Sequence, residues 1–276
     1  MATRAKPEIL FLDCDDCLYQ NGWATAGKIT KSIAAYTEGL GVSGEKAYSL
    51  YKEHGTCLKG MLAEGIMEAA GAEDFLVRAQ WLRTVLRLPL LVAAPAVAAR
   101  VVQLKVHDID YSDIAADPKL ATILAGLTVP TWVFTASTRE HAERCLQRIG
   151  IADLPWVGIV DTRTCKLETK HSPSSFDAAM AAAGVSNPAG CLLCDDSVKN
   201  IKAAKAHGWR TVLVGTNDRD SGLPITCEVR RWPHACRTRR VLPASPQNPD
   251  LCAQAADVII PSLHSLPEVA PELFAE

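Results

Sequence analysis

The sequence lacks several features that point to particular classes of protein. Its 276 residues carry a formal net charge of −2, so no overall positive field favours nucleic acid or an anionic membrane as a partner. The residues from Met1 to Pro7 lead into a short apolar stretch, so we expect no secretory leader. Residues 86–99 are nearly all apolar, but Arg87 and two prolines interrupt them. A run this short and broken does not favour a membrane span.

Among the ten cysteines, no C-x-x-C pair has a second pair at the spacing of a structural zinc site. Cys191 and Cys194 make one such pair, but they lie in an apolar strand pattern where a redox-active turn is out of place. Cys14 lies in a similar pattern, in which a thiol behaves as a small buried hydrophobe. We therefore expect reduced thiols and a reducing compartment, namely the cytoplasm, with the nucleus as an alternative.

The chain is long enough to bury a full core, and 48% apolar with 22% charged residues is ordinary for a soluble globular protein. From Asp117 onward, short apolar strand patterns alternate with helical ones. This alternation predicts an α/β fold: a doubly wound, Rossmann-like parallel sheet with helices on both faces. Strands are expected at 9–12, 131–136, 157–160, 191–195, 211–214 and 257–260. Helices are expected at 117–127, 138–149, 173–183 and 197–207, and a weak terminal helix, interrupted by Pro267 and Pro271, is expected at 263–274.

Only helices are predicted between the first strand and this alternation, at 25–41, 43–54 and 58–70. A doubly wound sheet normally reaches its second strand after one crossover helix. We therefore expect a helical cap inserted after the first strand. The predicted domains are a core of residues 1–20 with 112–276 and a cap of residues 21–111. Two further inserts are expected, about 77–105 in the cap and an irregular, exposed one about 217–254 in the core.

Acidic residues stand at the ends of two predicted strands. Asp13, Asp15 and Asp16 follow the first strand, and Asp195 and Asp196 end a later one. Like charges this close repel unless a cation or a proton lies among them. The carboxyl ends of parallel strands meet at the edge where such folds bind ligands. These oxygens suit Mg²⁺, which prefers carboxylates and water; the alternative is that they are solvated acids that cap the following helices.

Two further polar residues lie at the same predicted edge. Thr135 ends a strand just before a helix, where its hydroxyl and the nearby amides, including that of Ala136, suit an anion. Lys170 precedes the helix that begins at Pro173, and a lysine beside a phosphate would neutralise charge in phosphoryl transfer. The ordinary alternatives are a β-branched strand residue for Thr135 and a solvated side chain for Lys170.

Taken together, these motifs resemble the haloacid dehalogenase-like superfamily of Mg²⁺-dependent phosphatases. The four matching segments are residues 13–19 (DCDDCLY), residues 134–137 (FTAS), Lys170 with Pro173, and residues 194–197 (CDDS) with Asn200 and Gly208. Cys17 departs from the usual Thr or Val but is similar in size. The third motif departs too, because its proline more often follows the lysine directly.

The resemblance implies a role for each residue. Asp13 would be the nucleophile that forms an aspartyl-phosphate, and Asp15 would act as general acid and then as general base. Mg²⁺ would be held by Asp13, the carbonyl of Asp15, Asp195 and Asp196. Thr135, Ala136 and Lys170 would hold the phosphoryl oxygens, with Lys170 also counted as catalytic. The cap would close over the site.

A finer resemblance concerns the substrate. Residues 51–60 (YKEHGTCLKG) are similar to a cap signature of the pyrimidine 5′-nucleotidase-like subgroup, and residues 106–118 also resemble that subgroup. This implies a pyrimidine nucleoside 5′-monophosphate as substrate. His54, Thr56 and Lys59 are the candidate substrate contacts, and surface or capping roles are their alternatives.

Other functions stay open at this point. They are a phosphatase of another small metabolite, such as a sugar phosphate or phosphoglycolate, and a non-catalytic binding protein that retains the fold. A dehalogenase needs no Mg²⁺, which would leave Asp195 and Asp196 unexplained. The arginine-rich segment 230–240 could bind nucleic acid, which salt-dependent binding would reveal, but it is read as a solvated insert. The expected partner is a small phosphorylated metabolite, with no membrane partner and no inferred oligomeric state.

Overall fold

The structure is a computed structural model in which residues 6–68, 71–72, 75–76, 109–218, 222, 224–225 and 256–274 are described. The predicted insert at 77–105 lies outside these residues, and nearly all of the one at 217–254 does too. The described residues fall into two compact units. One lies within 1–23 and 114–276, and the other lies within 24–113. Among the described residues, no helix combines the length and apolar character that crossing a bilayer requires.

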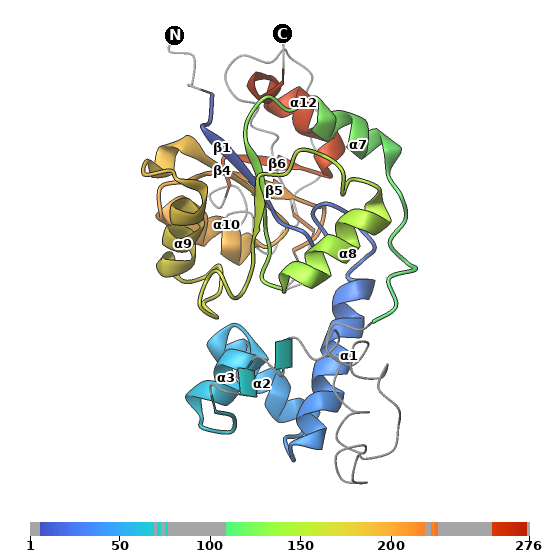
Figure 1. The fold of residues 1–276 in the computed structure, drawn as a ribbon, viewed down its shortest axis with the longest axis vertical. Helices are drawn as coiled ribbons and strands as arrows, with labels where there is room; N and C mark the ends of the chain where they lie inside the picture. The colour runs from blue at the N-terminus through green and yellow to red at the C-terminus, as the bar shows by residue number, and fades with distance from the viewer. Residues whose placement is uncertain are drawn as a thin grey trace, which may run out of the picture. The chain divides into compact units, whose positions relative to one another are not determined.

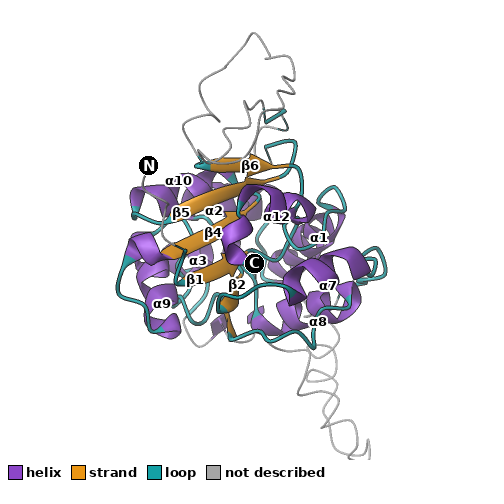
Figure 2. Ribbon diagram, turned by 90° about the horizontal axis from the view of Figure 1, so that it is seen from above, coloured by secondary structure: helices purple, strands orange, loops and turns teal. Residues whose placement is uncertain are grey.

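Six parallel strands form the centre of the first unit, in the order β3-β2-β1-β4-β5-β6 (Figures 1 and 2). They are β1 (Ile9–Leu12), β2 (Thr131–Phe134), β3 (Gly158–Val160), β4 (Cys191–Asp195), β5 (Arg210–Val214) and β6 (Val258–Ile260). Their residues are mostly buried, which explains why the strands appear in the sequence as continuous apolar runs. The predicted Rossmann-like sheet is confirmed.

The helices of this unit are α7 (Pro118–Ala125), α8 (Arg139–Ile149), α9 (Pro173–Ala183), α10 (Val198–Ala206) and α12 (Leu266–Val269). Three begin at a side chain that accepts a hydrogen bond from the third residue of the helix, namely Asp117, Thr138 and Ser197. The weak helix predicted at 263–274 is interrupted near its two prolines, as expected, but it is less continuous than the prediction. It is broken into α12 and two short 3₁₀ turns, because Pro267 and Pro271 cannot donate helical hydrogen bonds.

Helices cover both faces of the sheet, with α9 and α10 on one side and α7 and α8 on the other (Figure 2). On the first side, aromatic rings pack beneath the strand ends. Phe11 stacks on Trp209 with ring centroids 4.8 Å apart, and Phe176 meets Trp209 edge to face at 5.1 Å. Large buried rings of this kind contribute much of the apolar burial. They give the carboxyl ends of the strands a rigid support.

The second unit contains α1 (Ala24–Gly39), α2 (Gly44–His54) and α3 (Cys57–Ala63). Helices α2 and α3 pack so closely that a Cβ on Gly60 would lie 2.7 Å from the Cβ of Leu50, so the contact requires glycine. The helix predicted at 58–70 is shorter than expected. It ends at Ala63, and Gly65 then takes a positive φ of 67° that leaves the helix.

The strand order changes direction between β1 and β4, the point where open α/β sheets bind ligands. Pairing continues one hydrogen bond beyond β1, because the Asp13 N–H donates to the Cys194 carbonyl at 2.9 Å. The residues that follow these two strands therefore lie side by side.

Candidate active site

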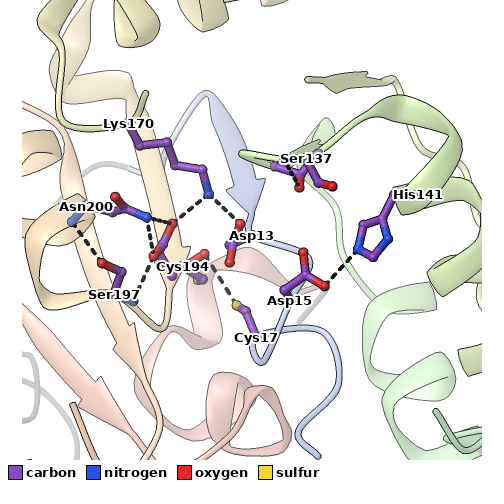
Figure 3. Close-up of polar contacts among 11 residues, drawn as sticks. Asp13, Asp15, Cys17, Ser137, His141, Lys170, Cys194, Ser197 and Asn200 are labelled. Carbon is purple, nitrogen blue, oxygen red and sulfur yellow. Dashed lines mark hydrogen bonds and ion pairs between the residues drawn. The ribbon is translucent and has the colours of Figure 1, made fainter. Parts of the chain in front are cut away.

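The centre of the site is an ion-paired group formed by Asp13, Lys170 and Asp195 (Figure 3). Lys170 Nζ donates to Asp13 Oδ1 at 2.5 Å and to Asp195 Oδ2 at 2.7 Å. All three residues are buried, and Lys170 is only 2% exposed. The structure thus brings together three of the predicted site residues, from the ends of β1 and β4 and from the loop before α9.

The loop that carries Lys170 is organised by a buried carboxylate that the sequence analysis missed. Asp161, which follows β3, accepts hydrogen bonds from the Thr164 N–H at 2.9 Å and the Thr164 hydroxyl at 2.8 Å. It also accepts from the Arg139 N–H at the start of α8, at 3.2 Å. At the far end of the loop, the Lys170 ammonium lies 4.9 Å from the ring centroid of Phe134. These contacts fix where the lysine points.

Asp195 is held by the start of α10. Its Oδ1 accepts from the Ser197 N–H at 2.9 Å and from Asn200 Nδ2 at 3.0 Å, while its Oδ2 binds Lys170 (Figure 3). Because Ser197 also caps α10, the strand end, the carboxylate and the helix start form one rigid unit. Asn200, which the fourth motif includes, is therefore a direct partner of Asp195.

Burial and charge act in opposite directions on the central ion pair. Burial raises the pKa of Asp13 to about 7; Lys170 opposes this rise, and the carboxylates of Asp195 and Asp15 add to it. Burial by itself would lower the pKa of Lys170, but Asp13 and Asp195 outweigh it and raise that pKa. The ammonium therefore stays charged, while Asp13 holds a proton for part of the time near neutral pH.

The carboxylates at this centre fit a divalent cation. Oxygens of Asp13, Asp195 and Asp196 all lie within 4.8 Å of one another, and all three residues are buried. With the three carboxylates ionised, Lys170 offsets one of three negative charges, so two remain for a cation to neutralise. Oxygen donors of this kind suit a hard ion such as Mg²⁺. The side chain of Asp15, whose carbonyl was the predicted ligand, belongs to a different group.

Asp15 lies on the other side of the loop and has different partners. Its Oδ1 lies 2.8 Å from His141 Nε2 (Figure 3). The same oxygen accepts a hydrogen bond from the Tyr19 hydroxyl at 2.5 Å. Burial disfavours the charged imidazole, but Asp15 outweighs it and raises the pKa of His141 well above its usual value. Burial and then Asp15 raise the pKa of Tyr19. Both partners therefore present a proton to the Asp15 carboxylate.

Sequence reasoning missed His141 and the role of Tyr19. Tyr19 lies four residues after Asp15 at the end of the first motif, and His141 is the third residue of α8. Asp16, the third acid of the first motif, has a local structural role. It adopts φ 54° and its Oδ1 accepts from the Trp23 N–H at 3.0 Å, so it shapes the loop after β1.

Two thiols adjoin Asp15 and His141. Cys14 precedes Asp15, and Cys145 Sγ lies 3.5 Å from His141 Nε2 on the same face of α8. A hydrogen bond between the two thiols is the largest influence on both, lowering the pKa of Cys145 to about 6 and raising that of Cys14 well above its usual value. All seven described cysteines are buried and free.

The predicted phosphate-binding residues lie at the end of β2. Thr135 is buried, and its Oγ1 accepts from the Ser137 N–H at 3.0 Å (Figure 3). Ala136 is exposed, and α8 begins three residues later. The threonine thus shapes the turn that leads to the helix N-terminus, and Ala136 is the exposed residue of that turn.

The predicted substrate contacts belong to the second unit. Thr56 caps α3, because its Oγ1 accepts from the Lys59 N–H at 3.1 Å. His54 ends α2, and its Nε2 lies 3.9 Å from Glu53 Oε2. The capping alternative thus holds for Thr56, and a substrate role for the three residues stays a prediction.

A comparison with protein families assigns the fold and the motifs to one group. The model of a family described as haloacid dehalogenase-like hydrolase matches residues 7–208, which is most of the chain. The chain belongs to the haloacid dehalogenase-like hydrolase family.

The chain is also similar to individual proteins and solved structures. Phosphate metabolism protein 8 of Saccharomyces cerevisiae is 34% identical over 87 residues; the match covers 30% of this chain and only 27% of the length of that protein. A mutant of CbbY from Rhodobacter sphaeroides, solved with xylulose-(1,5)-bisphosphate, is 16% identical with a TM-score of 0.52, covering 98% of this chain and 100% of that one. L-2-haloacid dehalogenase from Xanthobacter autotrophicus is 14% identical with a TM-score of 0.48, and the match covers 96% of this chain and 98% of that one. The similarity to CbbY, at 16% identity, shows a shared fold.

Proposed function

We propose that the protein is a magnesium-dependent phosphomonoester hydrolase that works through an aspartyl-phosphate on Asp13. The observation that carries this proposal is the buried group of Asp13, Lys170 and Asp195 at the point where the strand order reverses. A nucleophilic carboxylate, a fixed cation and spare carboxylates for a metal are the parts that phosphoryl transfer to an aspartate requires.

Asp13 is the attacking group. Lys170 holds its Oδ1, which fixes the carboxylate and leaves Oδ2 to attack phosphorus. A bond forms between Oδ2 and phosphorus as the bond from phosphorus to the leaving alkoxide breaks. Mg²⁺, held by Asp13, Asp195, Asp196 and the carbonyl of Asp15, would shield the carboxylate from the charge of the phosphate.

Asp15 acts first as the general acid and then as the general base. It is within hydrogen-bond reach of His141 and Tyr19, so a proton shared by Asp15 and His141 is available to the leaving alkoxide. Asp15 then takes a proton from the water that hydrolyses the aspartyl-phosphate. His141 and Tyr19 are positioning residues in this scheme, because they act through Asp15.

The phosphoryl oxygens are bound by groups at the end of β2. The Thr135 hydroxyl, the Ala136 N–H and the N-terminus of α8 offer donors and a partial positive charge. Lys170 adds a full positive charge that is already held in place. The geometry thus supplies fixed donors that need no rearrangement during the reaction.

We further propose membership of the pyrimidine 5′-nucleotidase-like subgroup and a pyrimidine nucleoside 5′-monophosphate as substrate. The support is the segment 51–60, which forms the end of α2 and the start of α3. His54, Thr56 and Lys59 of that segment are the proposed contacts. The buried free thiols fit action in a reducing compartment, the cytoplasm or the nucleus.

The test is phosphate release from a panel of nucleoside monophosphates, sugar phosphates and phosphoglycolate, with and without Mg²⁺. The matched pair of variants is Asp13→Asn and Asp177→Asn, the latter at a surface carboxylate that is 70% exposed. We expect Mg²⁺-dependent release that the first variant abolishes and the second retains. A preference for sugar phosphates would overturn the nucleotide substrate, and halide release from a haloacid would make the protein a dehalogenase. Phosphate binding without release would make it a binding protein.

A further inference from the structure

Two loop residues and two helix residues bring four metal-ligating atoms together beside the proposed active site. Cys14 and Asp15 follow β1, and His141 and Cys145 occupy positions i and i+4 of α8. The two thiol sulfurs, one imidazole nitrogen and one carboxylate oxygen all lie within 4.8 Å of one another. Positions i and i+4 share a helix face, which explains how α8 presents both of its ligands to the same point.

The distances are near those of a four-coordinate metal site. Zinc binds sulfur at about 2.3 Å and nitrogen or oxygen at about 2.0–2.2 Å, so tetrahedral ligands lie about 3.3–3.8 Å apart. His141 Nε2 is 3.5 Å from Cys145 Sγ and 2.8 Å from Asp15 Oδ1. No two of the four ligand atoms are more than 4.8 Å apart. Each atom would therefore need to move by about 1 Å or less to reach tetrahedral zinc geometry.

The chemistry of this group differs from that of the carboxylate centre. Asp13, Asp195 and Asp196 offer only oxygen, which suits Mg²⁺. Two sulfurs and an imidazole instead favour a softer ion, of which Zn²⁺ is the usual one in this coordination. Cys14, His141 and Cys145 are fully buried, while the Asp15 side chain is 17% exposed and offers the route of entry.

We propose that Cys14, Asp15, His141 and Cys145 form a second, thiolate-containing site that binds Zn²⁺. Binding releases the two thiol protons and the proton on His141 Nε2 to solvent, and the metal then holds Asp15 and His141 in place of the hydrogen bond between them. A carboxylate coordinated to zinc cannot donate a proton to a leaving group. Zinc therefore inhibits the protein at this site, an effect that rests on the proposed function of Asp15; the metal binding itself does not.

Cobalt spectroscopy tests the binding without any enzyme assay. The full chain, reduced and kept in excess Mg²⁺ to fill the carboxylate centre, is titrated with Co²⁺ in the absence of oxygen. We expect one equivalent to produce a thiolate-to-cobalt charge-transfer band and the strong visible bands of tetrahedral cobalt. Cys14→Ser and Cys145→Ser should lose the charge-transfer band. Cys191→Ser, at a buried thiol on β4 outside the group, should keep it.

A second measurement needs no variant. X-ray absorption at the zinc edge of the loaded wild-type protein should show two sulfur neighbours at about 2.3 Å with nitrogen and oxygen completing the shell. The absence of a charge-transfer band in folded protein would overturn the proposal, and the thiols would then be packing residues. Its persistence in Cys145→Ser, or a shell of oxygen and nitrogen only, would overturn it too, because the metal would lie elsewhere.

The inhibition is measured separately. Zn²⁺ at saturating Mg²⁺ should lower phosphate release about 100-fold or more in the wild type and in Cys191→Ser, the scale of a lost general acid. In Cys145→Ser the zinc-dependent loss, relative to that variant's own zinc-free rate, should largely disappear. Equal inhibition of all three proteins would overturn the inhibitory role. If no substrate is hydrolysed, the proposed function fails while the cobalt result stands.

Discussion

Asp13 and Asp15 are two residues apart, yet the protein gives them opposite surroundings. Asp13 is buried against Lys170, an ammonium whose pKa is raised by Asp13 and Asp195 and which therefore stays charged near neutral pH. Asp15 is partly exposed and is held by His141 and Tyr19, both of which carry protons that they can share. The loop between β1 and α1 thus separates two carboxylates into two environments.

The difference teaches how one short motif can serve two kinds of chemistry. A permanent cation and a metal centre stabilise a carboxylate that forms a covalent bond. Titratable neighbours instead suit a carboxylate that must gain and lose a proton within one cycle. Substitutions around one carboxylate should therefore have different effects from substitutions around the other, and the largest effect is expected at the carboxylates themselves.

Replacing each carboxylate by its amide should separate bond formation from proton transfer. Asp13→Asn should lower phosphate release about 10⁴-fold or more for every substrate, because no aspartyl-phosphate can form. Asp15→Asn should lower it about 10²- to 10⁴-fold. With p-nitrophenyl phosphate, whose leaving group needs no proton, Asp15→Asn should still give one rapid equivalent of p-nitrophenol before stalling. A burst from Asp13→Asn would reverse the assignments.

Removing the Lys170 ammonium should lower the stability of the protein, because Asp13 and Asp195 depend on it. Lys170→Met leaves Asp13 and Asp195 buried without their partner, so the free energy of unfolding of the metal-free protein should fall by about 3–5 kcal/mol. Urea denaturation measures this, and added Mg²⁺ should restore part of it. Lys205→Met, which breaks a half-exposed pair with Asp257, is the matched control and should cost less than about 1 kcal/mol. Equal costs would show that burial of the Lys170 pair adds nothing.

Removing the proton-sharing partner should affect only the Asp15 side. His141→Gln should lower kcat by about 10- to 100-fold, because Asp15 loses its orientation and its proton source. Its pH–rate profile should change shape, while Mg²⁺ affinity stays the same. Tyr19→Phe removes a single hydrogen bond and should cost about 1 kcal/mol of transition-state stabilisation or less. A change in Mg²⁺ affinity in either variant would contradict the separation of the two sides.

The raised pKa of Asp13 should make magnesium binding depend on pH. Near pH 6 the metal must displace a proton from a group whose pKa is about 7, so the apparent Kd should be about tenfold weaker there than at pH 8. The same shift means that the folded metal-free protein holds a proton that the unfolded chain releases near 3.8. Stability should therefore fall as pH rises from about 4 to about 7.

Calorimetry at the two pH values measures the effect on Mg²⁺ binding, and Asp13→Asn is the control in which the pH dependence should vanish. Binding that is equally tight at pH 6 and pH 8 would show that Asp13 stays ionised beside Lys170.

The smallest effect is expected at Cys17, the residue at which the first motif departs from the usual Thr or Val. Cys17 is buried, and its thiol donates to the Cys194 carbonyl at 3.5 Å. A threonine hydroxyl can make the same hydrogen bond, so Cys17→Thr should change activity by no more than about twofold and stability by less than about 1 kcal/mol. A larger loss in either assay would give the thiol a role that its single hydrogen bond does not explain.

Much of the fold could be predicted because local signals agree with the final structure. The predicted ranges 173–183 and 191–195 match α9 and β4 without adjustment. In α9, Ser172 and Pro173 define the start, and Gly184, at φ 70°, defines the end. The terminal segment 263–274 was harder, because its apolar spacing is helical while its prolines are not compatible with a continuous helix.

The site residues at the ends of strands could be predicted from the sequence, whereas the site residue on the face of a helix could not. Parallel strands bring Asp13 and Asp195 to the same edge whatever the details of packing. His141 had no such signal, because its partner Asp15 is 126 residues away and a histidine on an amphipathic helix is ordinary. Asp161 was missed for a similar reason, since its partners include the backbone amides of Arg139 and Thr164, which only the folded loop presents to it.

The central place of β1 in the sheet has a consequence for how the protein is made. Strand β1 is synthesised first, but its two neighbours lie about 120 and 180 residues further along the chain. At the usual rates of translation, β1 waits roughly 10–40 s before β4 exists. Until β2 has been made, the apolar strand has no partner in the sheet, and until β4 has been made it has a partner on one edge only, which makes it a natural client for chaperones. Asp13 cannot meet Lys170 until the ribosome has passed residue 170, so on the proposed function a nascent chain cannot act prematurely on the phosphate esters around it.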